Sequence, residues 1–186
     1  MLNDKILEFY SEFREEIQDY VKSNGPISVN AAFKTLFLSY LTEAGETLVS
    51  DCTLVDFKRD SENMRLDGYA FSEYFHSLTL LVSKYQSKGT PEKIKKTEID
   101  KLLRKALKFY KTCQTNYFDN LEESSDGYQA YEFIKAHKAD IETVNMLLAR
   151  ITCWLSSTFV QFLSCSPKHL LWKMSACCVL RSIVFI

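Results

Sequence analysis

The chain has 186 residues, of which 46% are hydrophobic and 13% aromatic, so it is long enough to bury a core as a single domain. Its formal net charge of -1 excludes a strong overall attraction to nucleic acid or to an anionic membrane, so any attraction to a polyanion must be local. The acidic, amphipathic N-terminus is not a signal peptide and the six cysteines form no CxxC pair, which predicts a cytoplasmic protein with free thiols and no structural zinc.

Two helices are predicted in the first 45 residues. Apolar side chains recur every three or four residues between positions 3 and 23, where an Asn-Gly-Pro step then ends the pattern. Ser28 can cap a second helix, whose continuous apolar stripe over residues 32–44 indicates a buried element. Glu43 and Glu46 stand at the end of this helix, and Glu46 is the better placed to reach a following sheet.

The pattern then changes to short segments rich in β-branched, aromatic or leucine residues, at 52–59, 64–71 and 77–85. Polar turn segments separate them, so they predict an antiparallel meander. Asp67 lies on the second segment and Lys84 on the third.

A long helix is predicted from Thr90 onward, with one apolar face and one basic face. Between Lys93 and Lys111 there are eight lysines or arginines and two acids. The favoured interpretation of residues 93–111 is solvated charge on an amphipathic helix, and the alternative is a stripe that binds phosphates. After a loop at 120–127, the apolar residues between Tyr131 and Ile151 suggest one or two further helices.

The last segment has an unusual composition, because no Asp or Glu occurs in the 44 residues after Glu142. One explanation is a membrane segment, but polar residues and the charges of Lys173 and Arg181 interrupt the apolar runs before they reach spanning length. The other, which we favour, is a translated frameshift that begins near Cys153. We therefore expect one domain at 1–151 followed by an atypical tail at 152–186, and no membrane association.

Asp67, Lys84 and Glu46 together could form a metal-dependent phosphodiesterase site. Such hydrolysis needs hard oxygen ligands for Mg²⁺, here Asp67 and Glu46, and a cation or base near the attacking water, here Lys84. Val82 stands two residues before Lys84, where such a site would hold a second acid or an amide. From the residues alone the plainer interpretation is favoured: Asp67-Gly68 as a turn signal and Lys84 as a solvated strand end.

The remaining residues able to carry out catalysis have no sequence support for a reactive role. His76 falls between two strands and has no partner at ligand or triad spacing, so we interpret it as a turn residue. Cys52 and Cys113 have no neighbour that would lower a thiol pKa, and we interpret them as small core residues.

The order helix, three strands, helix is that of the restriction-endonuclease-like PD-(D/E)XK core. The segments LTEAGET and MRLDGYAFSEYFHSLTLLVSKYQ, followed by the basic helix, resemble the N-terminal region of AIPR proteins, named for abortive infection and phage resistance. The resemblance covers residues 30–85 well and extends more loosely to 151, and it aligns Glu46, the LDGY step at 66–69 and the strand at 80–85. Val82 departs from the pattern of active nucleases of this fold, which implies loss of catalysis.

The sequence thus predicts an α+β fold with a small mixed or antiparallel sheet flanked by helices. The resemblance implies a phage-defence protein whose N-terminal domain carries a weak or degenerate Mg²⁺-dependent nuclease site of Asp67, Lys84 and Glu46. The alternative is a non-catalytic module that binds nucleic acid through residues 93–111, or binds a protein partner or a second copy of the chain. A small membrane-associated protein, anchored through residues 151–186, is the third and least favoured hypothesis.

Overall fold

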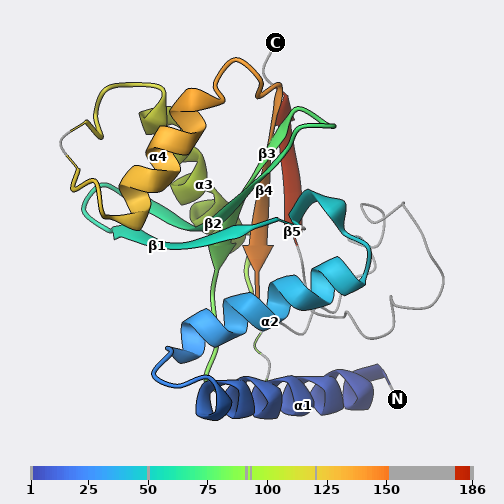
Figure 1. Ribbon diagram of the computed structural model, residues 1–186. Helices are drawn as coiled ribbons and strands as arrows, with labels where there is room; N and C mark the ends of the chain where they lie inside the picture. Colours follow the sequence, from blue (N-terminus) through green and yellow to red (C-terminus); the bar gives the residue numbers. More distant parts are fainter. Residues whose placement is uncertain are drawn as a thin grey trace.

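The computed structural model describes residues 2–49, 51–90, 92, 94–119, 121–150 and 179–184, and the structural statements below concern these residues (Figure 1). The elements follow one another along the chain as α1 (Leu2–Ser23), α2 (Val29–Glu43), the 3-10 turn η1 (Thr47–Val49), β1 (Thr53–Arg59), β2 (Met64–Ser72), β3 (Ser77–Ser83), α3 (Lys96–Cys113), α4 (Asp126–Ala136), β4 (Thr143–Ala149) and β5 (Val179–Val184).

The strands form one mixed sheet in the order β1-β2-β3-β4-β5. β1, β2 and β3 are a meander of antiparallel neighbours, β4 pairs with β3 in parallel, and β5 pairs antiparallel with β4. The parallel pair requires a crossover connection, which α3 and α4 provide. The predicted α+β class and the order helix, three strands, helix are confirmed.

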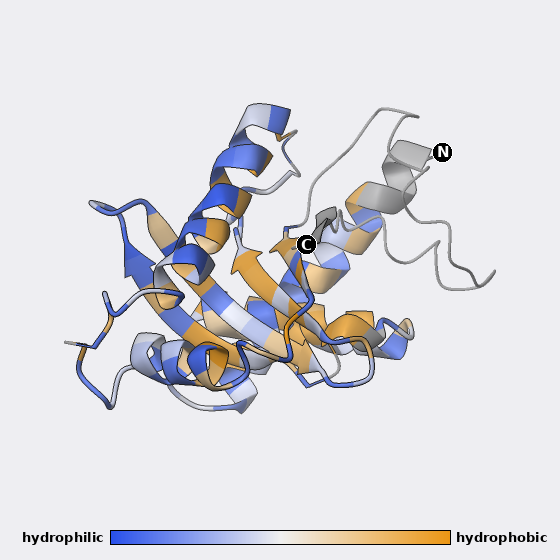
Figure 2. Ribbon diagram, turned by 90° about the horizontal axis from the view of Figure 1, so that it is seen from above, coloured by the Kyte–Doolittle hydropathy of each residue, from blue (hydrophilic) through white to orange (hydrophobic). Residues whose placement is uncertain are grey.

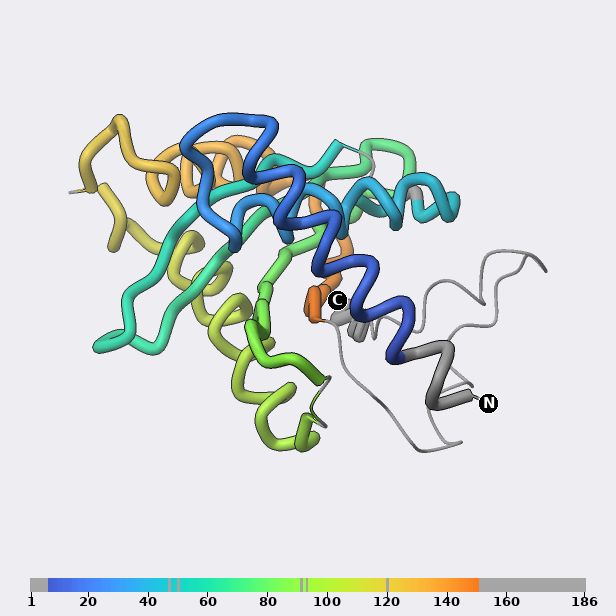
Figure 3. The backbone as a smooth tube through the Cα atoms, turned by 90° about the horizontal axis from the view of Figure 1, so that it is seen from below, coloured from blue at the N-terminus to red at the C-terminus, as the bar shows by residue number. Residues whose placement is uncertain are grey.

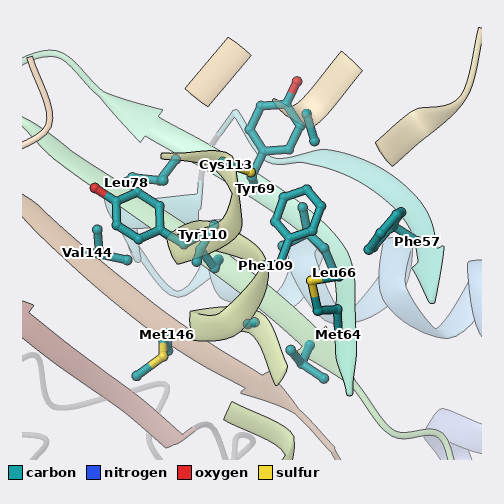
Figure 4. Packing of buried hydrophobic residues seen from close by; sticks show 14 of the residues in the cluster. Phe57, Met64, Leu66, Tyr69, Leu78, Phe109, Tyr110, Cys113, Val144 and Met146 are labelled. Carbon is teal, nitrogen blue, oxygen red and sulfur yellow. The ribbon is translucent and has the colours of Figure 1, made fainter. Parts of the chain in front are cut away.

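Helices cover both faces of the sheet, and each face has its own apolar cluster. α3 and α4 pack on one face, which we call the α3 face, with side chains such as Leu66 and Leu78 (Figure 4). Leu80 and Val82 belong to the same cluster. α1 and α2 pack on the other, the α2 face, with Leu81 and Leu147. Figures 1 and 3 show α1 outermost on this side, crossing α2. Successive residues of β3 alternate between the two clusters, as expected for a strand covered on both sides.

Hydropathy follows this layering (Figure 2). Hydrophobic residues concentrate in the central strands, while hydrophilic and hydrophobic bands alternate along the helices. Ser28 caps α2 as predicted, because its hydroxyl accepts a hydrogen bond of 3.1 Å from the Ala31 N–H. Within the described residues, no helix is long and apolar enough to cross a membrane.

The structure corrects two secondary-structure expectations. Residues 143–149, predicted as helix, form β4, whose run from Val144 to Ala149 is buried throughout. A continuous apolar run is compatible with a buried parallel strand and with a buried helix, so hydrophobic periodicity does not distinguish the two. α3 begins at Lys96 rather than near Thr90, because Ile94 is non-helical and packs into the cluster of the α3 face.

The expectations for the tail and for the boundary at 151 fall largely on residues 151–178, 185 and 186, which lie outside the described residues. Within the tail, Val179–Val184 forms β5 beside β4.

Candidate functional site

Asp67 of β2 is the buried acid around which the candidate site is built. Its side chain is 2% exposed and accepts several hydrogen bonds. Arg65 donates to both carboxylate oxygens, from Nε to Oδ2 at 2.8 Å and from Nη2 to Oδ1 at 3.1 Å. The backbone N–H of Ser83 donates to Oδ2 at 2.7 Å. The carboxylate is therefore paired in a two-pronged geometry and hydrogen-bonded across to β3.

Lys34 of α2 completes this charge cluster from the opposite side. Lys34 is only 5% exposed, and its ammonium donates to the Val55 carbonyl at 2.8 Å and lies 3.9 Å from Oδ1 of Asp67. A buried ammonium requires a counter-ion and acceptors, and Asp67 with the backbone of β1 supplies both. The amphipathic pattern of α2 gave no sign of this role, since Lys34 lies among its buried apolar residues.

Lys84 belongs to a different cluster, at the end of β3. Its ammonium pairs with the Glu98 carboxylate of α3, which also receives the buried guanidinium of Arg150 at 3.4 Å. The Lys84 ammonium is the main cause that holds the pKa of Glu98 below its ordinary value. Arg150 reaches Gln86 Oε1 at 3.4 Å as well. Lys84 is thus part of an ion-pair network that links the ends of β3 and β4 to α3.

Asp67 and Lys84 consequently turn toward opposite faces of the sheet. Asp67 meets Lys34 on the α2 face, whereas Lys84 meets Glu98 on the α3 face. Val82, which occupies the position of the missing acid, is fully buried in the cluster of the α3 face. The structure therefore does not bring the Asp67 carboxylate and the Lys84 ammonium to one place.

Glu46 follows α2, where its carboxylate accepts the N–H of Leu48 at 3.1 Å. A nearby hollow of about 320 Å³ is lined by Leu38, Ser39, Thr42, Glu43, Val49 and Cys52, and it includes neither Glu46 nor Asp67. In the part of the chain that the structure describes, no three His, Cys, Asp or Glu side chains are grouped closely enough to hold a metal ion.

The other residues considered from the sequence have structural positions. His76 lies in the β2–β3 turn with a φ of 46°, in the left-handed region that turns use. Burial raises the pKa of the Cys52 thiol to about 12 and raises that of Cys113 as well. Both cysteines are free, and for Cys52 the effect of burial outweighs that of the Lys34 ammonium, which acts in the opposite direction on its pKa. Raised thiol pKa values argue against a nucleophilic role.

The basic helix presents a continuous row of cations to solvent. Its outer ridge consists of Thr97, Lys101, Arg104, Lys108 and Lys111, all of them exposed and none of them acidic. From Lys101 to Lys111 the ridge extends about 15 Å, at about 1.5 Å per residue.

Few of these cations are used within the protein. Lys108 donates to the Glu62 carbonyl at 2.5 Å, and Lys105 beside the ridge pairs with Asp60 at 3.2 Å. Among the described residues, no ion pair is found for Lys101, Arg104 or Lys111.

Comparison with protein families identifies the family of this domain. The model of the abortive infection phage resistance protein N-terminal domain matches residues 33–149, which is more than half of the chain. This range includes α2 from Phe33 onward, the sheet from β1 to β4, and the whole basic helix. No curated protein and no solved structure matches the chain.

Proposed function

The chain belongs to the abortive infection phage resistance family through its N-terminal domain, which associates it with phage defence, and from this premise we propose that the domain binds nucleic acid without cleaving it. The α3 ridge would contact the phosphate backbone, and the nuclease-like centre would serve as structure. The observation that carries the proposal is a contrast in ion pairing. Asp67 and Lys84 of the centre form internal ion pairs, whereas among the described residues no ion pair is found for Lys101, Arg104 or Lys111 of the ridge.

The surroundings of Asp67 argue against a catalytic role. A Mg²⁺ ligand must offer free oxygen lone pairs to the ion and usually shares it with water. Arg65, Lys34 and the Ser83 N–H already occupy both oxygens of Asp67, and the side chain is closed to solvent. A cation entering beside the buried Lys34 ammonium and the partly buried Arg65 guanidinium would meet strong repulsion.

The position of Lys84 supports the same conclusion. A lysine that orients water or stabilises charge must reach the reacting phosphate together with the metal ligands. The Lys84 ammonium instead lies on the α3 face in contact with Glu98. Metal-dependent cleavage by Asp67, Lys84 and Glu46 would require both ion-pair networks to open.

The α3 ridge has the features of a phosphate-binding surface. Its four cations lie on one face of a well-packed helix, so their spacing is fixed before a ligand arrives. Neutralising phosphates releases counterions from nucleic acid, which gives a gain in affinity that falls with salt. A net charge of -1 for the chain means that this attraction is confined to the ridge.

Binding of a short fluorescent duplex and a short single strand to the full chain, measured by anisotropy over a series of salt concentrations, tests the proposal. We expect the triple variant Lys101→Glu, Arg104→Glu and Lys111→Glu to abolish binding at moderate salt. Single Lys101→Ala should lower the slope of log K against log salt by about 0.9.

The matched control is the triple variant Lys22→Glu, Lys88→Glu and Lys138→Glu, which changes net charge equally at exposed positions away from the ridge. Equal loss of binding in both triple variants would refute a specific role of the ridge.

Cleavage is measured in parallel with Mg²⁺ or Mn²⁺ on plasmid and single-stranded substrates. We expect no cleavage by the wild-type chain. Metal-dependent cleavage that is lost in both Asp67→Ala and Lys84→Ala, with folding retained, would instead establish the nuclease and overturn the proposal.

A further inference from the structure

The turn between β2 and β3 exposes two adjacent aromatic side chains. Tyr74 is 85% and Phe75 52% exposed, although the other large apolar residues of the hairpin are buried or partly buried. Their rings form an edge-to-face pair with centroids 4.8 Å apart. We call Tyr74 and Phe75 the aromatic tip. Two large aromatic surfaces side by side in water are a feature of interaction sites rather than of ordinary protein surface.

The tip is held in place by hydrogen bonds on both sides. The carbonyl of His76 accepts the N–H groups of Glu142 at 2.8 Å and Thr143 at 3.2 Å, which ties the turn to the start of β4. The hydroxyl of Ser72 accepts the N–H of Phe75 at 3.4 Å. Because the turn is anchored in this way, little conformational entropy of the turn would be lost when a partner binds it.

The charges around the tip indicate what kind of partner it fits. Glu73 flanks Tyr74 in the turn, Glu142 is tied to the turn by its backbone, and Asp140 lies two residues before it; all three are exposed. Lys138 is the only exposed cation in the stretch 137–142. This acidic rim repels nucleic acid and anionic membranes, whereas a protein pocket with basic edges would complement it.

The tip and the α3 ridge lie at opposite ends of β2. Lys105 and Lys108 contact the β1–β2 turn, which precedes Met64 at the start of the strand, whereas the tip follows Ser72 at its end. The nine residues of β2 span about 30 Å at about 3.3 Å per residue. A ligand on the ridge would therefore leave the tip accessible.

We propose that the aromatic tip is a docking element for a protein other than a second copy of this chain, which receives Tyr74 and Phe75 in an apolar pocket edged by Lys or Arg. The rings supply the buried area at the centre of the contact, and Glu73 and Glu142 pair with the basic edge. Aromatic side chains in such central positions carry a large share of binding energy.

The test places the photo-crosslinking residue p-benzoylphenylalanine at Tyr74 of the full chain, produced in its host cells with and without phage. The matched control carries it at Tyr117, which is 51% exposed and lies after α3. We expect an adduct from position 74, absent from position 117, to a single different protein. The crosslinked peptide should contain apolar residues flanked by Lys or Arg.

Two variants of the position-74 protein test the chemistry of the contact. Phe75→Ser should lower the adduct at least about tenfold through lost apolar area, and Glu73→Lys with Glu142→Lys should do so through repulsion. Thermal unfolding verifies that these surface variants fold, and the ridge should bind nucleic acid as in the wild type.

Adducts to nucleic acid, to lipid or to a second copy of the chain would overturn the proposal. The same holds for no adduct above the Tyr117 control, and for an adduct that withstands both sets of substitutions.

Discussion

Asp67 and Lys84 leave neighbouring strands of one sheet toward opposite faces, and each is neutralised by a helix on its own side. Lys34 of α2 lies 3.9 Å from the Asp67 carboxylate, and Glu98 of α3 contacts the Lys84 ammonium. Two residues that the sequence places on facing strands, as parts of one catalytic centre, are thus parts of two separate structural networks.

Replacing Asp67 with Asn should destabilise the fold strongly. The change leaves the buried Lys34 ammonium and the Arg65 guanidinium without their carboxylate, and breaking a buried pair typically costs about 3 to 5 kcal/mol. Urea unfolding at neutral pH should show this loss, with Glu46→Gln as a control that changes stability by less than about 1 kcal/mol. A variant with wild-type stability that has lost metal-dependent cleavage would contradict the structural role of Asp67.

A double-mutant cycle separates the Lys34–Asp67 pair from the rest of the cluster. Lys34→Met alone should destabilise the protein, since the Val55 carbonyl loses its donor and Asp67 loses one cation. The double variant with Asp67→Asn should lose less unfolding free energy than the sum of the two single losses, by about 1 kcal/mol or more. Strict additivity in the unfolding free energies would mean that Lys34 and Asp67 do not interact.

The sequence predicted most of the fold because the first helix has a periodic apolar face and the meander strands are bounded by polar turns. The structure reproduces the helix at 3–23 as α1, and the short segments rich in β-branched, aromatic or leucine residues as β1, β2 and β3. β4 escaped prediction because it lies between β3 and β5 and is buried from Val144 onward, so its sequence has no period.

The candidate site was harder to predict because a local irregularity decides which way Asp67 faces. Leu66 and Tyr69 both belong to the cluster of the α3 face although they are three residues apart, and the β1–β2 register shifts between Leu54 and Phe57. A strict alternation of side chains between the two faces of the sheet, counted along the sequence, therefore fails at Asp67. Its partner Lys34 is 33 residues away in the sequence, and no local sequence pattern predicts such a contact.

Gly127→Ala should destabilise the packing of α4 on the sheet. A Cβ at this position would lie 2.2 Å from Cδ2 of Phe57, whose ring packs edge-to-face against Phe109 in the core (Figure 4). The intrinsic gain in helix propensity, about 1 kcal/mol, should be outweighed by overpacking of about 1 to 3 kcal/mol. Thermal unfolding would measure the difference, and Gly89→Ala, where a Cβ meets nothing within 4 Å, is the control. A more stable Gly127→Ala protein would show that Phe57 can move without cost.

Cys52 and Cys113 should resist alkylation in the folded protein. Burial raises both thiol pKa values, that of Cys52 to about 12, so the thiolate fraction at pH 8 is very small. Iodoacetamide labelling followed by peptide mapping should therefore show slow modification at both sites in buffer and rapid modification in urea. Fast labelling of Cys52 in native buffer would reveal that the α2 end of the sheet opens.

The Lys84–Glu98 ion pair predicts a pH-dependent difference between the wild type and Lys84→Met. Because the folded pKa of Glu98 is depressed, the unfolded chain binds its proton more readily, and stability from this pair rises with pH. The pair is partly exposed, so at neutral pH Lys84→Met should lower the unfolding free energy by only about 0.5 kcal/mol. The difference should vanish as the pH falls below the ordinary Glu value of about 4.3 and through the folded pKa. Urea titrations at several pH values measure it, with Lys101→Met on the ridge as the control. A difference that stays constant down to acid pH would mean that Lys84 stabilises the fold through its aliphatic stem rather than through Glu98.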